Sequence, residues 1–208
     1  MNKFVQETII TRTIMTKEEL MRRAIALSEE SVRKGGGPFG AVIARDGVVV
    51  AEASNRVTLD NDPTAHAEVS AIRAASLRLG TFDLSGCDIY TSCEPCPMCL
   101  GAIYWAHLDH IYYANDRKDA AAIGFDDDFI YQEIALAPAD RHKPMRILLP
   151  DEAKKAFEAW RESDSKTEYC PLQANIRHWQ RILAFLVAGE LSRRRANYRL
   201  FVMDDEKN

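Results

Sequence analysis

The stretches PTAHAE (residues 63–68) and PCPMC (residues 95–99) decide the fold and chemistry of this 208-residue chain. They supply one imidazole and two thiols, which are typical ligands of Zn²⁺: His66, Cys96 and Cys99. Three protein ligands leave a fourth tetrahedral position for water, as in a catalytic zinc site, and the metal lowers the pKa of that water from ~15.7 towards ~7. Glu68 is not needed as a ligand, so we expect it to move protons at this site.

Both stretches lie where a helix is predicted to begin. Residues 61–63 are helix-starting residues followed by an alanine-rich run, and two prolines flank the first cysteine of the second stretch. Residues i and i+2 point to different sides of a helix, so His66 and Glu68 can share one site only beyond the helix end. Cys96 and Cys99 are three residues apart and stack on one face. We therefore predict two converging helix N-termini, whose positive dipole ends favour thiolates.

Other metal chemistries fit parts of this pattern. A Cys-x-x-Cys pair also occurs in structural zinc knuckles and redox pairs, and Cys93 with the two later cysteines resembles an iron–sulfur run without its fourth Cys-Pro. Neither alternative accounts for His66 and Glu68 on a separate helix start. Cys93 follows an apolar strand, so we expect it to be a small buried residue rather than a ligand.

Length and composition indicate one compact enzyme domain with extensions. The chain is 47% hydrophobic and carries a net charge of −4, which gives no electrostatic footprint for a polyanion and argues against a nucleic-acid partner. No apolar stretch approaches the ~18–20 residues of a membrane span, and no secretory signal is present, so we expect a cytoplasmic protein without a membrane partner. The five cysteines, an odd number, are expected to be reduced thiols.

The order of predicted elements indicates an α/β fold. A capping box at residues 16–19 opens a helix that ends at the glycine cluster of residues 35–37, and Asp46-Gly47 marks a tight hairpin. Apolar runs predict five strands, at residues 41–44, 48–51, 89–91, 111–114 and 146–149. Helices between them predict a three-layer α/β/α arrangement, with a mixed five-stranded sheet and helices on both faces.

The glycine-rich segment 35–40 has a weak phosphate-loop character. It follows a helix rather than a strand and lacks Gly-Lys-Ser/Thr, so we expect a tight loop into the first strand. The ring of Phe39 then becomes a pocket wall or part of the core.

The motifs together resemble the bacterial-type guanine deaminases of the cytidine/deoxycytidylate deaminase superfamily, whose signature is H-x-E…P-C-x-x-C. The likeness runs from about Leu20 to Tyr169. It is carried by residues 37–42, 61–68, 91–106, 124–127, 129–131, 157–160 and 168–169. The resemblance implies a cytidine deaminase-like fold and a zinc-dependent hydrolase that converts guanine to xanthine and ammonia.

The resemblance also implies roles for individual residues. His66, Cys96 and Cys99 would bind one zinc ion per subunit, Glu68 would be the proton shuttle, and Asp127 would be a second carboxylate beside the purine 2-amino group. Around the base the resemblance places five residues: Phe39, Asn55, Ala67, Trp105 and Tyr169. Flat aromatic faces suit stacking on a purine, and an asparagine offers a donor and an acceptor together.

Each specificity residue also has a structural alternative. Asn55 follows a strand and could close an Asx turn. The aspartates at 126–128 could cap the following helix, and the register decides which of them faces the pocket. Trp105 could belong to the core.

Both ends depart from the family pattern. We predict an N-terminal extension at residues 1–15, a zinc-dependent deaminase domain at 16–169 and a C-terminal helical extension at 170–208. In the family the chain stops near the residue that matches Tyr169, and that segment is exchanged between subunits, so the resemblance implies a homodimer. The extension carries apolar residues at helical spacing and a net charge of +3, with Arg193-Arg194-Arg195 as a solvated face or a polyanion contact.

Three other functions fit parts of the sequence. A tRNA adenosine deaminase would need a basic surface near the pocket, and a cytosine or pterin deaminase would share the zinc centre. A non-catalytic, zinc-stabilised nucleic-acid-binding module would fold with zinc yet release no ammonia. Ammonia release from free guanine separates the first function from all of these.

Overall fold

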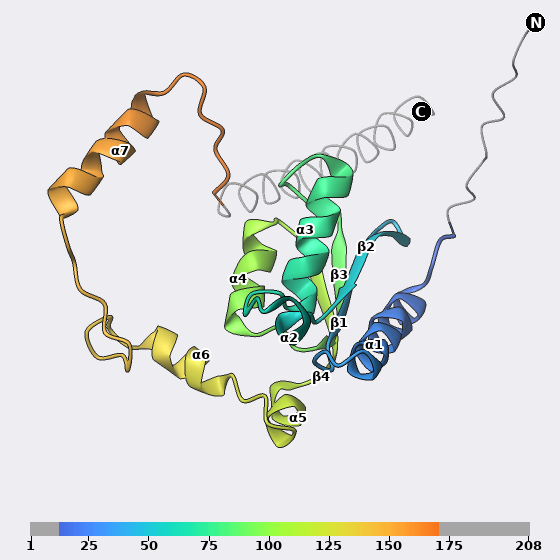
Figure 1. Ribbon diagram of the computed structural model, residues 1–208. Coiled ribbons are helices and arrows are strands. Elements are labelled where there is room, and N and C mark those ends of the chain that lie inside the picture. The colour runs from blue at the N-terminus through green and yellow to red at the C-terminus, as the bar shows by residue number, and fades with distance from the viewer. Residues whose placement is uncertain (1–12, 171–208) are drawn as a thin grey trace, which may run out of the picture. The chain divides into compact units, whose positions relative to one another are not determined.

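The computed structural model describes residues 13–170 of the chain (Figure 1). The first helix, α1 (Lys17–Arg33), begins with the predicted capping box: Glu19 N donates to Thr16 Oγ1 at 3.2 Å and Thr16 N donates to Glu19 Oε2 at 2.7 Å. These two bonds satisfy backbone groups that a helix start otherwise leaves unpaired. The other helices are α2 (Val57–Asp60), α3 (Ala67–Leu79), α4 (Pro97–Trp105), α5 (Arg117–Ala122), α6 (Asp128–Ala135) and α7 (Pro150–Glu162).

Four strands form one mixed sheet in the order β2-β1-β3-β4. They are β1 (Gly40–Arg45), β2 (Val48–Ser54), β3 (Asp88–Cys93) and β4 (His110–Asn115). β1 is antiparallel to β2 and to β3, whereas β3 and β4 are parallel. The predicted hairpin is confirmed: Asp46 and Gly47 have φ of 51° and 75°, the positive values that a tight two-residue turn of this kind requires.

The prediction of a fifth strand is wrong for the residues that the structure describes. Residues 144–148 form no strand, and β4 is the edge of the sheet. Ile147 and Leu148 are 87% and 84% exposed. Their apolar pattern resembles that of a strand, but a strand also needs a neighbouring backbone to pair with, and a local pattern does not supply one.

Helices cover both faces of the sheet, as predicted (Figure 1). Because neighbouring strand residues point to opposite faces, Ala41 and Ile43 belong to the core beside α3 and α4, whereas Val42 and Ala44 belong to the core beside α1. α3 presents alanines at every fourth position, Ala67, Ala71 and Ala75, and all three are fully buried. These small side chains let α3 lie close to the sheet and bring its first residues to the end where the site forms.

The chain divides into two compact units between Thr167 and Glu168. None of the helices at residues 13–170 is long and apolar enough to cross a membrane. The predicted helical extension, including Arg193-Arg194-Arg195, and most of the predicted N-terminal extension lie outside the described residues.

Candidate active site

Three side chains from two helix starts meet at one point and could hold a metal ion. His66 Nδ1 lies 3.6 Å from Cys96 Sγ and 3.5 Å from Cys99 Sγ. The three atoms all lie within 4.8 Å of one another. His66 and Cys96 occupy the N-cap positions of α3 and α4, and Cys99 follows in the first turn of α4. The predicted convergence of two helix N-termini is therefore confirmed.

The spacing of these atoms fits zinc. With Zn–S of about 2.3 Å and Zn–N of about 2.05 Å, a tetrahedral angle places nitrogen and sulfur about 3.6 Å apart. The two observed nitrogen–sulfur distances, 3.6 and 3.5 Å, match that separation. A set of one imidazole and two thiols is also the set expected for an open, catalytic zinc site.

The local electrostatics favour the deprotonated ligand form of Cys96. A hydrogen bond from Cys99, helped by the nearby His66 ring, lowers the pKa of Cys96 to about 4. A backbone hydrogen bond from Cys99, in the first turn of α4, also lowers the pKa of Cys96. Cys93 lies outside this arrangement: burial raises the pKa of its thiol to about 11, and Cys93 Sγ donates to Asp116 O at 3.7 Å. The prediction that Cys93 is buried is confirmed.

Glu68 lies next to Cys99, one of the three clustered side chains. Its side chain belongs to the first turn of α3 and the residue is only 7% exposed. Glu68 Oε2 accepts a hydrogen bond from Cys99 Sγ at 3.4 Å. Burial raises the pKa of this carboxyl, because a low-dielectric surrounding disfavours the charged form. A buried carboxyl group is therefore in contact with one of the proposed ligands, Cys99.

The three aspartates at residues 126–128 have different surroundings. Asp126 Oδ1 accepts from Asp128 N at 3.1 Å, so Asp126 closes a turn before α6. Asp128 Oδ2 accepts from Gln132 Nε2 at 2.7 Å, one turn along α6. Asp127 makes no side-chain cap bond to α6. Burial raises the pKa of the Asp127 carboxyl and the nearby Cys96 raises it further, so Asp127 lies within electrostatic range of the cluster.

Asn55 and Phe39 lie at the ends of β2 and of the glycine loop. Asn55 is 5% exposed, and its Oδ1 accepts from Val57 N at 3.2 Å, which is the predicted Asx turn. Asn55 N donates to Phe39 O at 2.9 Å, so the two candidate substrate residues are joined through the backbone. The Phe39 ring meets the Phe125 ring edge-on, with centroids 5.0 Å apart.

The three remaining predicted substrate residues differ in burial and in where they lie. Ala67 is fully buried between His66 and Glu68. Trp105 is 53% exposed at the last position of α4, about 12 Å along the helix axis from its first residue at 1.5 Å per residue. Tyr169 is 54% exposed and belongs to the second compact unit.

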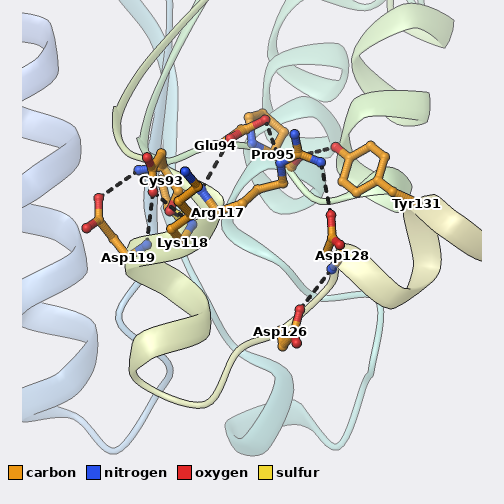
Figure 2. Close-up of polar contacts among 10 residues, drawn as sticks. Cys93, Glu94, Pro95, Arg117, Lys118, Asp119, Asp126, Asp128 and Tyr131 are labelled. Carbon is orange, nitrogen blue, oxygen red and sulfur yellow. Dashed lines mark hydrogen bonds and ion pairs between the residues drawn. The ribbon is translucent and has the colours of Figure 1, made fainter.

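Three residues near the site had no role in the sequence prediction: Glu94, Arg117 and Tyr131. Figure 2 shows Arg117 between Glu94, in the loop before Cys96, and the start of α6. Glu94 and Tyr131 belong to the stretches that carry the family resemblance, so a signal was present for both. Arg117 follows β4 in a polar segment whose pattern gives no indication of a long-range contact.

Comparison with known proteins agrees with this geometry. Residues 14–115 match the cytidine and deoxycytidylate deaminase zinc-binding region. Guanine deaminase of Bacillus subtilis is 52% identical over 156 residues, which cover 74% of this chain and 100% of that protein. Its X-ray structure matches with a TM-score of 0.73 at 52% identity, covering 75% of this chain and 100% of that chain.

A second solved structure, of lower sequence identity, supports the same family assignment. Guanine deaminase from Nitrosomonas europaea matches with a TM-score of 0.54 at 34% identity, covering 56% of this chain and 68% of that chain. The match to a zinc-binding region agrees with the cluster formed by His66, Cys96 and Cys99, and the sequence relative and both structures are guanine deaminases. The chain therefore belongs to the zinc-dependent cytidine and deoxycytidylate deaminase superfamily and, within it, to the family of the bacterial guanine deaminases.

Proposed function

We propose that this protein is a guanine deaminase, which converts guanine and water to xanthine and ammonia. The observation that carries the proposal is the buried carboxyl of Glu68 in contact with Cys99, beside three atoms spaced for zinc. A purely structural zinc site would gain nothing from that carboxyl. The identity of 52% with a guanine deaminase, over that protein's whole length, supports guanine as the substrate.

The metal would be held by His66 Nδ1, Cys96 Sγ and Cys99 Sγ. When bound, zinc supplies a Lewis acid that lowers the pKa of a water molecule. Glu68 takes the proton from the attacking water and delivers it to the purine ring nitrogen next to C2. The C–O bond forms at C2. Glu68 then moves the proton of the new hydroxyl to the amine, the C2–N bond breaks, and ammonia leaves with the C2 carbonyl of xanthine left behind, so atoms and charges balance. General acid–base catalysis of this kind contributes ~10²–10⁴-fold.

The other roles concern recognition of the base. Asp127 accepts a hydrogen bond from the 2-amino group and helps it to depart as ammonia. Asn55 pairs with the polar edge of the purine, because its amide is held at the end of β2 by the Asx turn. The rings of Phe39 and Trp105 stack on the base, and the backbone of Ala67 contacts it between His66 and Glu68.

Ammonia release from a panel of free bases tests the function. Guanine, adenine and cytosine are offered separately to the zinc-loaded protein, together with an unmodified tRNA. We expect ammonia from guanine at a rate far above that from the other three. Turnover of tRNA adenosine with no turnover of free guanine would favour the tRNA adenosine deaminase alternative, and a zinc-loaded protein that releases no ammonia from any of them would favour the binding module.

We also propose a homodimer in which the segment near Tyr169 is exchanged and closes over a substrate pocket. Supporting observations are the open edge strand β4 and the apolar residues of the segment that follows α6. Ile147, Leu148 and Phe157 are 87%, 84% and 78% exposed, and none of the residues of α7 is buried. Exposed apolar area of this extent, distributed over a segment of about twenty residues, is typical of a subunit interface.

Molecular mass in solution tests the assembly. We expect a dimer by light scattering, and a chain ended after Tyr169 should keep both the dimer and the activity if residues 170–208 are an accessory. A monomer with full guanine deaminase activity would exclude the exchange. A cytoplasmic location is part of the same proposal, because the ligand thiols must stay reduced, and cell fractionation would test it.

A further inference from the structure

The segment that carries Asp127 has little apolar anchorage. It runs from α5 to α6, and none of the residues of α6 is buried. Phe125 and Phe129 on either side of Asp127 are 46% and 51% exposed. Packing in the core fixes Glu68 on α3, but it does not fix Asp127. Apart from the edge-on contact of the Phe125 ring with Phe39, the position of Asp127 therefore depends on polar and charged contacts.

Arg117 makes two of those contacts and joins them to the loop before Cys96. Its backbone N–H donates to Glu94 Oε2 at 3.2 Å, and its Nε lies 3.2 Å from Glu94 Oε1. One terminal nitrogen lies 3.5 Å from Asp128 Oδ1, and the guanidinium carbon lies 4.7 Å from the centre of the Tyr131 ring. One side chain thus connects the loop before Cys96 to both the first residue and the first turn of α6 (Figure 2).

The base of Arg117 is itself fixed. Asp116 caps α5 by accepting hydrogen bonds from Lys118 N at 2.8 Å and Asp119 N at 2.9 Å, and Asp116 N donates in turn to Asp119 Oδ2 at 3.0 Å. Glu94 N donates to Asn115 O at 2.9 Å, which joins the Glu94 loop to the end of β4. The guanidinium therefore extends from a rigid helix start.

Tyr131 makes a second contact between the same segment and the loop before Cys96. Its hydroxyl donates to Pro95 O at 2.9 Å, and Pro95 directly precedes Cys96. The Tyr131 side chain makes both contacts: its ring lies under the Arg117 guanidinium and its hydroxyl donates to Pro95 O. The two contacts therefore depend on each other. Asp127 lies four residues before Tyr131 and is held relative to the cysteine ligands through this pair.

We propose that Arg117 is the positioning residue that holds the Asp127 carboxyl beside the metal cluster for guanine turnover, a role that rests on the proposed function. Exposed ion pairs contribute little to folding stability, and the Arg117 and Asp128 side chains are 40% and 55% exposed. The network therefore serves to orient Asp127 rather than to stabilise the fold. Only arginine has a planar fork that can meet two carboxylates while it covers an aromatic ring.

Substitution of Arg117 separates orientation from stability. We expect Arg117→Ala to lower kcat/KM for guanine at least about tenfold, mainly through kcat, because a small displacement of a reacting group is costly. Zinc content and the thermal midpoint should stay unchanged. Arg117→Lys keeps the charge without the fork and should recover only part of the rate. The control Lys118→Ala removes the same charge from the next position of α5 and should leave the rate unchanged.

A double-mutant cycle with Asp127 shows whether Arg117 acts through that carboxyl. In an Asp127→Asn background, Arg117→Ala should change kcat/KM by less than about twofold, since its target is already lost. Losses that simply multiply, or a single Arg117→Ala variant with normal turnover, would overturn the proposal. A drop in zinc content or in the thermal midpoint that accounts for the lost activity would also overturn it.

Hydrogen exchange tests the same role without any turnover. Arg117→Ala should speed amide exchange in peptides covering residues 124–135 and leave those covering α3 and α4 unchanged. Unchanged exchange at residues 124–135 would overturn the positioning role. If the unsubstituted protein released no ammonia from guanine, the proposed function would fail while this measurement still decided whether Arg117 holds the segment.

Discussion

Replacing Glu68 with glutamine removes proton transfer while keeping the shape of the site. The residue is 7% exposed and in contact with Cys99, and glutamine has nearly the same volume and keeps an oxygen that can accept from Cys99 Sγ. The fold and the three ligand atoms should therefore survive. What glutamine cannot do is take a proton from water and return it to the base, a role that contributes ~10²–10⁴-fold.

We expect Glu68→Gln to lower kcat for guanine at least ~10²-fold, which corresponds to about 2.7 kcal/mol in activation free energy. The assay is ammonia release at saturating guanine, with zinc measured on the same sample by atomic absorption. Glu19→Gln is the matched control, because Glu19 lies in the capping box of α1 and glutamine also serves in that box. Near-normal turnover by a fully zinc-loaded Glu68→Gln protein would refute the assignment of the proton shuttle.

Three further predictions test the ligands, the specificity and the core. Cys99→Ser should lose most of the bound zinc and lower the thermal midpoint, because metal binding is coupled to folding; a variant that keeps one zinc per chain would show that the ligand set is wrong. Asp127→Asn should lower kcat/KM for guanine by about 2 kcal/mol with zinc unchanged, and an unaffected rate would exclude the proposed contact with the 2-amino group. Ile43→Ala should cost about 2–5 kcal/mol in the free energy of unfolding, measured with denaturant, because Ile43 is fully buried under α3; a loss below 1 kcal/mol would mean that the core relaxes around the missing atoms.

The metal centre was predictable because each of its parts is local in the sequence. His66 and Glu68 occupy one helix start and the two cysteines another, and proline and cap residues mark both starts. The convergence of the two starts followed from one geometric constraint, namely that residues two apart on a helix cannot face the same side. The hairpin at Asp46 was predictable for the same reason, since its turn residues are adjacent.

The incorrect prediction of a fifth strand shows the limit of what a local sequence pattern can predict. Residues 146–149 have the apolar pattern of a strand, and such a pattern reports that a segment tends to be buried without saying against what. The structure leaves Ile147 and Leu148 exposed on this chain. If the proposed dimer is formed, their partner lies on a second subunit, which no pattern within one sequence can identify.

The two carboxyl groups of the site are supported in different ways. Glu68 is fixed by the sheet-packed face of α3, whose alanines are fully buried, so a sequence that keeps this core keeps the proposed proton shuttle in place. Asp127 is held by polar contacts through Glu94, Arg117 and Tyr131, which substitutions can alter without unfolding the domain. In this fold the proposed proton-transfer group, Glu68, is held by the core. The proposed recognition of the amino group, by Asp127, depends instead on the segment after β4, whose sequence can change without unfolding the domain.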